Sequence, residues 1–267
     1  MFVPSMVTRA FRRGFASRPR RIILCRHGES EGNVNEDAYV STADWKISLT
    51  QKGRGQVRES GRKLAELVGD DPMLFYCSPY RRAEQTMEEL RKCVDEDNIW
   101  GVKEEPRISE QQFGNFQNVE QVRAAKAERQ QFGRFFFRFP NGESGLDVYN
   151  RVTGFTGTIL RDFQAFGKPL DLNVVVVTHG LALRLFLMRW FHMSVDEFEK
   201  SVNPHNAQLI VMERCIAEGT DDAYFRLTQE TVDSCNLPDH LAGTRIRFDH
   251  KDFSSDGRIN FDFRDQR

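Results

Sequence analysis

The sequence predicts an α/β fold of three layers, in which helices cover both faces of a mostly parallel central sheet. Strand-like apolar runs alternate with amphipathic helical segments, which is the pattern of a parallel sheet with crossover helices. Four consecutive valines at 174–177 favour a strand buried on both faces. The chain has 267 residues, of which 39% are hydrophobic, enough to bury one substantial core.

Short apolar runs bounded by polar or turn-forming residues predict the strands. The run at 173–177 is the clearest, and the run at 99–102 is the weakest. In chain order the expected strands are 22–25, 73–77, 99–102, 173–177, 208–212 and 224–227.

Apolar residues at helical spacing predict the helices, and capping residues mark several starts. Thr50 and Ser144 are suitable N-caps, and residues 194–197 (SVDE) fit a capping box. The expected helices are 50–67, 81–94, 120–137, 144–166 and 181–191, with one more after Ser194.

We expect one domain at 21–230 with an extension at each end. Residues 1–20 are rich in arginine, and no acidic residue precedes Glu29. Such a start is typical of an organelle transit peptide, so we expect a mitochondrial protein. A cytoplasmic enzyme with a basic extension is the alternative. Residues 231–267 alternate polar and aromatic residues, and no structure is assigned to them.

The composition of the chain limits which partners and cofactors we expect. The net charge of −1 gives no reason to expect a nucleic acid partner, and no apolar stretch is long enough for a membrane span. The five cysteines form no C-x-x-C pair, and no H-E-x-x-H motif occurs, so we expect neither a metal nor another cofactor. No pattern indicates an oligomeric state.

Two histidines follow strand-like runs. His27 comes after the run at 22–25 and His179 after the run at 173–177, and a glycine follows each. Ligands of open α/β sheets bind beyond the carboxyl ends of the strands. If these strands are neighbours, both imidazoles therefore open into one crevice. Alone, each histidine is more often a turn or core residue.

A third segment delivers arginines to a helix start. Residues 78–86 (SPYRRAEQT) follow the apolar run at 73–77 and place Arg81 and Arg82 in the first turn of the expected helix. Backbone amides, the helix dipole and guanidinium groups all attract an anion there. The alternative, a solvated basic turn, is less favoured because cations are unfavourable at a helix N-terminus.

Together these motifs resemble the histidine phosphatase (phosphoglycerate mutase-like) superfamily. Residues 26–30 (RHGES) resemble its RHGE signature, and 78–86 resemble its second arginine motif. Three further stretches are similar to family segments in the family's order: 108–114 (ISEQQFG), 140–144 (PNGES) and 178–180 (THG). The run at 132–140 (FGRFFFRFP) is most similar to small plant and fungal phosphoglycerate mutase-like proteins.

The resemblance implies a role for each matched residue. His27 is the expected nucleophile, which forms a phosphohistidine, and its second ring nitrogen should donate to a carbonyl group that fixes the tautomer. Glu110 is the expected general acid and then base. The residues expected to bind the phosphate are Arg26, Asn33, Arg82, His179 and Gly180. Three of them, Arg26, Arg82 and His179, are also expected to be catalytic.

We therefore expect a metal-independent phosphatase that hydrolyses phosphomonoesters of small molecules. A phosphoglycerate mutase is the first alternative, but Leu181 stands where mutases typically carry asparagine, and their tandem arginine pair has no clear match. The same motifs are also compatible with a protein phosphatase and with a non-catalytic phosphate-binding module. The basic residues at 120–138 either form a lid that binds distal substrate groups or make a solvated helix face.

Overall fold

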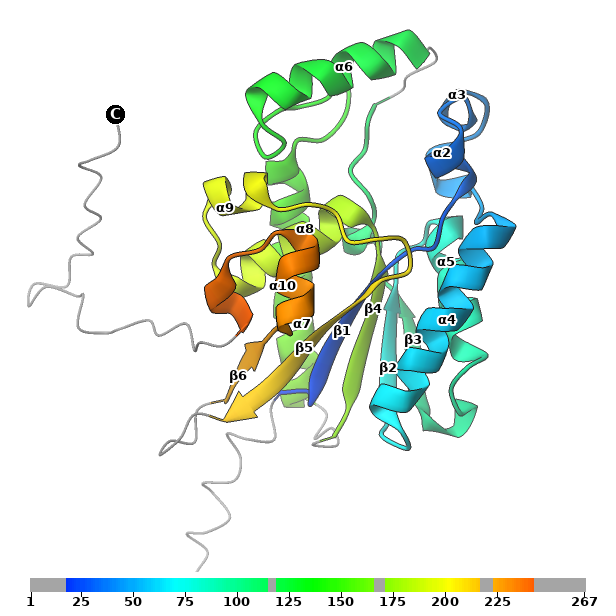
Figure 1. Cartoon of the computed structure of the whole chain (residues 1–267), viewed down its shortest axis with the longest axis vertical. Helices are drawn as coiled ribbons and strands as arrows, with labels where there is room; N and C mark the ends of the chain where they lie inside the picture. The colour runs from blue at the N-terminus through cyan, green and yellow to red at the C-terminus, as the bar shows by residue number, and fades with distance from the viewer. Residues whose placement is uncertain (1–17, 115–118, 166–170, 217–222, 243–267) are drawn as a thin grey trace, which may run out of the picture.

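The structure is a computed structural model that describes residues 18–114, 119–165, 171–216 and 223–242. A six-stranded sheet lies at its centre, with the strand order β3-β2-β4-β1-β5-β6 (Figure 1). The strands are β1 (Arg21–Arg26), β2 (Met73–Cys77), β3 (Ile99–Glu104), β4 (Asn173–Thr178), β5 (Leu209–Ile216) and β6 (Ala223–Arg226). Strand β4 pairs in parallel with β1 and β2, and β2 pairs in parallel with β3. Strand β5 is antiparallel to β1 and β6, so the mostly parallel sheet is confirmed.

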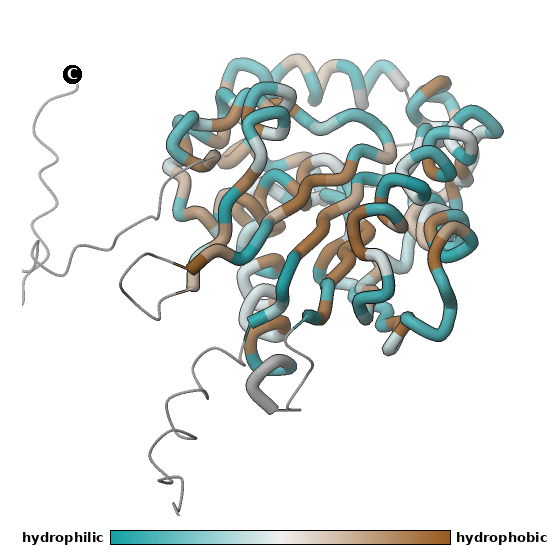
Figure 2. The backbone as a smooth tube through the Cα atoms, turned by 60° about the horizontal axis from the view of Figure 1, so that its bottom comes forward, coloured by the Kyte–Doolittle hydropathy of each residue, from teal (hydrophilic) through white to brown (hydrophobic). Residues whose placement is uncertain are grey.

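Helices cover both faces of the sheet, which confirms the three layers. Helices α4 (Gln51–Val68) and α5 (Arg81–Arg91) lie on one face. Helices α7 (Gly145–Ala165), α8 (Gly180–Phe191) and α10 (Gln229–Cys235) lie on the other. Figure 2 shows the central strands as apolar segments enclosed by helices with hydrophilic stretches.

Side-chain alternation along the strands divides the core between the two faces. Ile22 and Val174 contribute to the cluster under α7 and α8, whereas Ile23 and Val175 contribute to the cluster under α4 and α5. All four side chains are fully buried. The continuous apolar runs in β1 and β4 follow from burial on both faces.

The remaining elements are short helices, 3₁₀ turns and one longer helix, most of them near the carboxyl ends of the parallel strands (Figure 1). The helices are α2 (Glu31–Val34), α3 (Ala38–Ser41), α6 (Val119–Phe132) and α9 (Val195–Lys200). The 3₁₀ turns are Asp44–Lys46, Glu96–Asn98, Pro106–Ile108 and Asp239–Ala242. Helices α2 and α3 were not predicted, because a four-residue helix has no apolar period to detect.

The helix expected at 120–137 is shorter in the structure. Helix α6 ends at Phe132 because Gly133 has a φ of +85°, a conformation that stops a right-handed helix. In the chain beyond it, Phe135 and Phe137 are buried, whereas Phe136 is 63% exposed. Strands β3 and β5 are longer than expected, and α5 ends three residues earlier.

The C-terminal part of the described chain packs on the domain. The limit expected at residue 230 falls inside α10, and Leu237 and Leu241 are buried in the same cluster as α8. Of the extensions expected at 1–20 and 231–267, residues 1–17 and 243–267 lie outside the described residues. Within the ranges that the structure describes, every helix is too short or too polar to cross a bilayer.

Candidate active site

Three neighbouring strands bring the predicted residues to one edge of the sheet. Arg26 of β1 is in register with Thr178 of β4, and Cys77 of β2 is in register with Val177. The backbone N–H of His27 donates to the Thr178 carbonyl at 3.0 Å. The rings of His27 and His179 lie with their centroids 5.2 Å apart. The two histidines therefore do share one site, as the motifs predicted.

The His27 ring is held with one nitrogen available for attack. Its Nδ1 lies 2.7 Å from the Gly28 carbonyl oxygen. Since a carbonyl oxygen only accepts, Nδ1 carries the proton and Nε2 carries the lone pair. This is the bond expected from the sequence. Burial, and then the charges of Arg82 and Arg26, hold the pKa of His27 well below its ordinary value, so the ring is uncharged at neutral pH.

The turn after His27 needs a glycine. A Cβ on Gly28 would lie 2.7 Å from the backbone oxygen of Gly53 in α4. The Gly28 N–H donates to Thr86 Oγ1 at 3.1 Å, and the Thr86 hydroxyl donates to the Arg82 carbonyl oxygen at 2.7 Å. The first histidine motif and the arginine motif are thus joined through a threonine and a close backbone contact.

Two arginines are anchored through one end of the guanidinium. Arg26 Nη1 donates to the Pro204 carbonyl oxygen at 2.6 Å. Arg82 Nη1 donates to the Asp44 carbonyl oxygen at 2.7 Å and to its Oδ1 at 2.8 Å. The Nε of each arginine is buried and has no hydrogen-bond partner among the described residues. A buried N–H without a partner is costly, so both arginines are ready to bind an anion.

His179 presents a third unpaired donor. Its Nε2 lies 2.8 Å from Ser78 Oγ, and that oxygen accepts the Tyr80 N–H at 3.4 Å. The Ser78 hydroxyl can therefore donate to Nε2, which places the ring proton on Nδ1. Nδ1 is buried and has no hydrogen-bond partner in the described part of the chain. Burial, and then the charges of Arg82 and His27, hold the pKa of His179 well below its ordinary value.

Asn33 is fixed by donors that all reach one oxygen. Its Oδ1 accepts from Ser30 N and Ser30 Oγ, each at 3.1 Å, and from Asn206 Nδ2 at 3.2 Å. With the oxygen used, the amide NH₂ is the end that is left to bind a phosphate oxygen. Asn206 Nδ2 also lies 3.2 Å from the His27 carbonyl oxygen. Asn206 and Pro204 lie in the loop before β5, and no sequence pattern indicated either residue.

Glu110 follows the 3₁₀ turn Pro106–Ile108, beyond the end of β3. Burial lowers the pKa of Arg26 and the Glu110 carboxylate raises it, so the carboxylate lies close to Arg26. The Arg151 guanidinium donates to the backbone carbonyl of Glu110 at 3.0 Å. No sequence pattern indicated this contact of Arg151.

Gly180 is the first residue of α8, directly after His179. A Cβ there would lie 2.8 Å from the side-chain amide of Asn203, so the glycine permits a close contact with the loop before β5. The helix start places its first backbone N–H groups beside His179, where they can contribute to anion binding.

The basic residues at 120–138 differ in whether they form ion pairs. Arg123 and Lys126 of α6 form ion pairs with Glu36 at 3.1 and 2.6 Å. Arg129 lies with its guanidinium 5.3 Å from the Phe139 ring centroid, and its Nε is buried without a hydrogen-bond partner in the described ranges. Burial and Arg134 lower the pKa of Arg129, whereas Glu110 raises it. Arg129 therefore lies close enough to Glu110 to feel its charge, while Arg123 and Lys126 attach α6 to the segment after α2.

Comparison with known proteins identifies the family. The profile of the histidine phosphatase superfamily (branch 1) matches residues 22–219. The chain belongs to the histidine phosphatase superfamily. A phosphoglycerate mutase-like protein of Arabidopsis thaliana is 46% identical over 213 residues, which cover 76% of this chain and 67% of the relative. The expected resemblance to plant phosphoglycerate mutase-like proteins is confirmed.

Phosphatases of the superfamily are also similar to this chain. A broad-range acid phosphatase of Saccharomyces cerevisiae is 32% identical over 288 residues, which cover 74% of this chain and 86% of the relative. Among solved structures, a mycobacterial glucosyl-3-phosphoglycerate phosphatase in complex with inorganic phosphate superposes with a TM-score of 0.60 at 21% identity. That match covers 78% of this chain and 95% of the mycobacterial one, and it supports the histidine phosphatase fold.

Proposed function

We propose that the protein hydrolyses phosphomonoesters of small molecules through a phosphohistidine on His27, without a metal ion. The observation that carries the proposal is a set of three buried nitrogens, Arg26 Nε, Arg82 Nε and His179 Nδ1, that have no hydrogen-bond partner among the described residues. They belong to residues close to His27, because the His179 ring lies 5.2 Å from the His27 ring and the charges of Arg82 and Arg26 lower the pKa of His27. Phosphoryl transfer depends mainly on positioning and on charge stabilisation at the equatorial oxygens. Two guanidiniums and an imidazole N–H supply that stabilisation.

The reaction proceeds in two displacements. The lone pair of His27 Nε2 attacks phosphorus, the P–O ester bond breaks, and the leaving oxygen takes the proton of the Glu110 carboxylic acid. Water then attacks the phosphohistidine, and the Glu110 carboxylate takes a proton from that water. The P–N bond breaks, Nε2 recovers its lone pair, and phosphate leaves. The bond from Nδ1 to the Gly28 carbonyl holds the ring in the same tautomer throughout.

Hydrolysis of p-nitrophenyl phosphate in EDTA tests this mechanism, with His27→Ala assayed beside the wild type. We expect turnover that survives the chelator and disappears in the variant. Turnover unchanged in His27→Ala would overturn the proposal, and binding of phosphate with no turnover of any ester would indicate a binding module.

A phosphatase is favoured over a mutase by the residue after Gly180. Leu181 is buried in the apolar core and offers no polar ligand to a second substrate group. Relatives of this chain nevertheless include a 2,3-bisphosphoglycerate-dependent phosphoglycerate mutase of Gloeobacter violaceus at 28% identity. Rapid exchange of 3- and 2-phosphoglycerate, primed by 2,3-bisphosphoglycerate, would identify a mutase. Preferential turnover of a phosphopeptide panel would identify a protein phosphatase.

We propose that Arg129 binds a distal anionic group of the substrate. Its Nε is buried and has no hydrogen-bond partner among the described residues, and the Glu110 carboxylate lies close enough to raise its pKa against the effects of burial and Arg134. Arg129→Met should therefore raise KM for phosphoglycerate more than KM for glycerol phosphate, which lacks the carboxylate. Equal changes for both substrates would contradict this role.

We also propose a mitochondrial location, which is supported by the arginine-rich sequence at 1–20 that contains no acidic residue. Replacing Arg9, Arg12 and Arg13 by glutamine removes three of the five arginines in residues 1–20. A fluorescent fusion of the full chain should enter mitochondria, and the triple variant should stay in the cytosol. Cytosolic fluorescence for both would favour the cytoplasmic alternative.

A further inference from the structure

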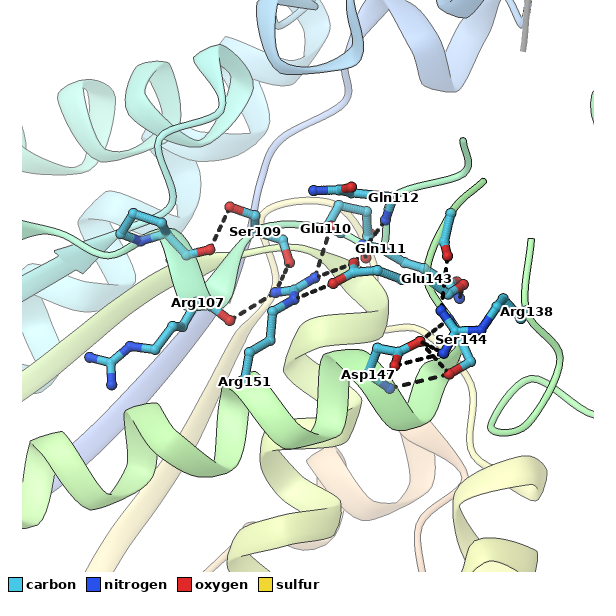
Figure 3. A network of polar contacts seen from close by, with 12 residues as sticks. Arg107, Ser109, Glu110, Gln111, Gln112, Arg138, Glu143, Ser144, Asp147 and Arg151 are labelled. Atoms are coloured by element: carbon cyan, nitrogen blue, oxygen red, sulfur yellow. Dashed lines mark hydrogen bonds and ion pairs between the residues drawn. The ribbon is translucent and has the colours of Figure 1, made fainter. Parts of the chain in front are cut away.

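The guanidinium of Arg151, on helix α7, uses all of its hydrogen-bond donors on one small region (Figure 3). Its Nε donates to Glu143 Oε1 at 2.9 Å, and its Nη2 donates to Glu143 Oε2 at 3.0 Å. Its Nη1 donates to the carbonyl oxygens of Arg107 and Ser109 at 2.8 and 2.7 Å. The second Nη2 hydrogen goes to the Glu110 carbonyl oxygen at 3.0 Å. A guanidinium has five N–H donors, and each is matched here by an acceptor.

These bonds hold the backbone of the segment that carries the proposed general acid. Arg151 binds three carbonyl groups between residues 107 and 110, and the fourth, that of Ile108, accepts from Thr178 Oγ1 at 2.6 Å. Thr178 directly precedes His179 at the end of β4. The turn before Glu110 is thus tied both to α7 and to the strand that presents the second histidine.

Glu143 holds the same segment from its other end. Its Oε2 accepts the Gln112 N–H at 3.0 Å, and its own N–H donates to the Gln112 carbonyl oxygen at 2.8 Å. Gln111 Nε2 donates to the Glu143 carbonyl oxygen at 2.8 Å. Arg151 and Glu143 therefore form hydrogen bonds to the chain on both sides of Glu110, and these bonds do not involve the Glu110 side chain (Figure 3).

We propose that Arg151 and Glu143 are positioning residues that hold Glu110 where it can protonate the leaving oxygen. Since every donor of Arg151 is used, its guanidinium is not available to bind substrate. Both side chains are about four-fifths covered, with exposed fractions of 19% each. The proposal rests on the proposed function of Glu110 as general acid, and it concerns only the geometry that makes the acid effective.

Lysine cannot replace arginine in this arrangement. An ammonium group has three donors from a single point, whereas the planar fork of Arg151 reaches four groups in fixed directions. A misplacement of about 1 Å at a catalytic group can cost about a hundredfold in rate. We therefore expect Arg151→Lys and Arg151→Met to impair proton transfer to a similar degree. Glu143→Gln keeps one acceptor oxygen and should have the smaller effect.

The test is single-turnover release of the alcohol from two esters, measured with enzyme in excess and EDTA present. p-Nitrophenyl phosphate has a leaving group that departs without protonation, whereas glycerol phosphate requires a proton from the acid. We expect Arg151→Met to slow glycerol release about a hundredfold and p-nitrophenol release only a few fold. Arg161→Met, on an exposed turn of the same helix, is the matched control and should leave both rates unchanged.

The same measurement in a Glu110→Gln background separates positioning from general damage. With no acid left to position, adding Arg151→Met should change glycerol release little, so the two substitutions should be strongly non-additive. An equal loss for both esters, or a full Arg151→Met effect in the Glu110→Gln background, would overturn the positioning role. Absence of turnover in the wild type would instead overturn the proposed function.

Discussion

Buried neutral histidines make the stability of the protein depend on pH in a defined direction. His27 and His179 are at most 4% exposed, and burial together with nearby arginines holds the pKa of each well below its ordinary value. In the unfolded chain both imidazoles titrate at about pH 6.5. Below that pH the unfolded state binds two protons that the folded state does not, so the free energy of unfolding falls as the pH falls.

The size of the effect follows from the number of protons. Each proton contributes a slope of about 1.4 kcal/mol per pH unit, so the pair contributes about 3 kcal/mol per unit below about pH 6. The loss ends where the histidines of the folded protein also become protonated. Carboxylates act at lower pH: Lys52 lowers the pKa of Glu29 from 4.5, and that contribution is lost only as the pH falls below this value.

Urea denaturation between about pH 7.5 and pH 5 measures the slope. Replacing both histidines by glutamine should remove most of the decline in unfolding free energy over this interval. His205→Gln, which removes an exposed imidazole, is the control and should decline as the wild type does. If the double variant lost stability with the same slope as the wild type, the two histidines would not be neutral in the folded protein, and the neutral nucleophile would be refuted.

Three substitutions test other contacts of the site. Ser78→Ala leaves His179 Nε2 buried without its hydroxyl partner. The free energy of unfolding should therefore fall by about 1–3 kcal/mol, and inhibition by phosphate should weaken. An unchanged inhibition constant would contradict the assigned tautomer of His179. Asn33→Ala removes the amide NH₂ that Ser30 and Asn206 orient, so it should weaken phosphate inhibition about tenfold, whereas an unaltered constant would remove Asn33 as a ligand. Gly28→Ala forces a Cβ against Gly53 and should cost about 1–3 kcal/mol in a denaturation experiment, and a neutral result would show that the turn can relax.

The sequence predicted the parts of the site that lie at strand ends. An apolar run followed by a histidine and glycine specifies where a strand stops, and parallel strands end at the same edge of a sheet. That reasoning located His27, His179 and the arginine motif, but the pairing of β4 with β1 and with β2 was missing. The family resemblance supplied the distinction between nucleophile and ligand.

The residues that the sequence did not indicate act through contacts distant in the chain. Asn206 reaches His27 across 179 positions, and Arg151 binds carbonyl groups 41 to 44 positions away. Neither contact leaves a periodic or local pattern, because hydrogen bonds to backbone carbonyls depend on tertiary structure alone. The end of α6 at Phe132 has a local cause, namely the positive φ of Gly133. The helical spacing of the neighbouring residues led us to predict a helix that continues past this glycine.

Trapping the covalent intermediate tests the central claim most directly. The full chain is incubated with a ³²P-labelled phosphomonoester in EDTA, quenched in alkali, which preserves phosphohistidine, and digested for mass spectrometry. The mechanism predicts acid-labile label on the peptide that contains His27, formed as fast as the first turnover and absent in His27→Ala. Label on another residue, or turnover with no labelled protein at any time, would contradict it.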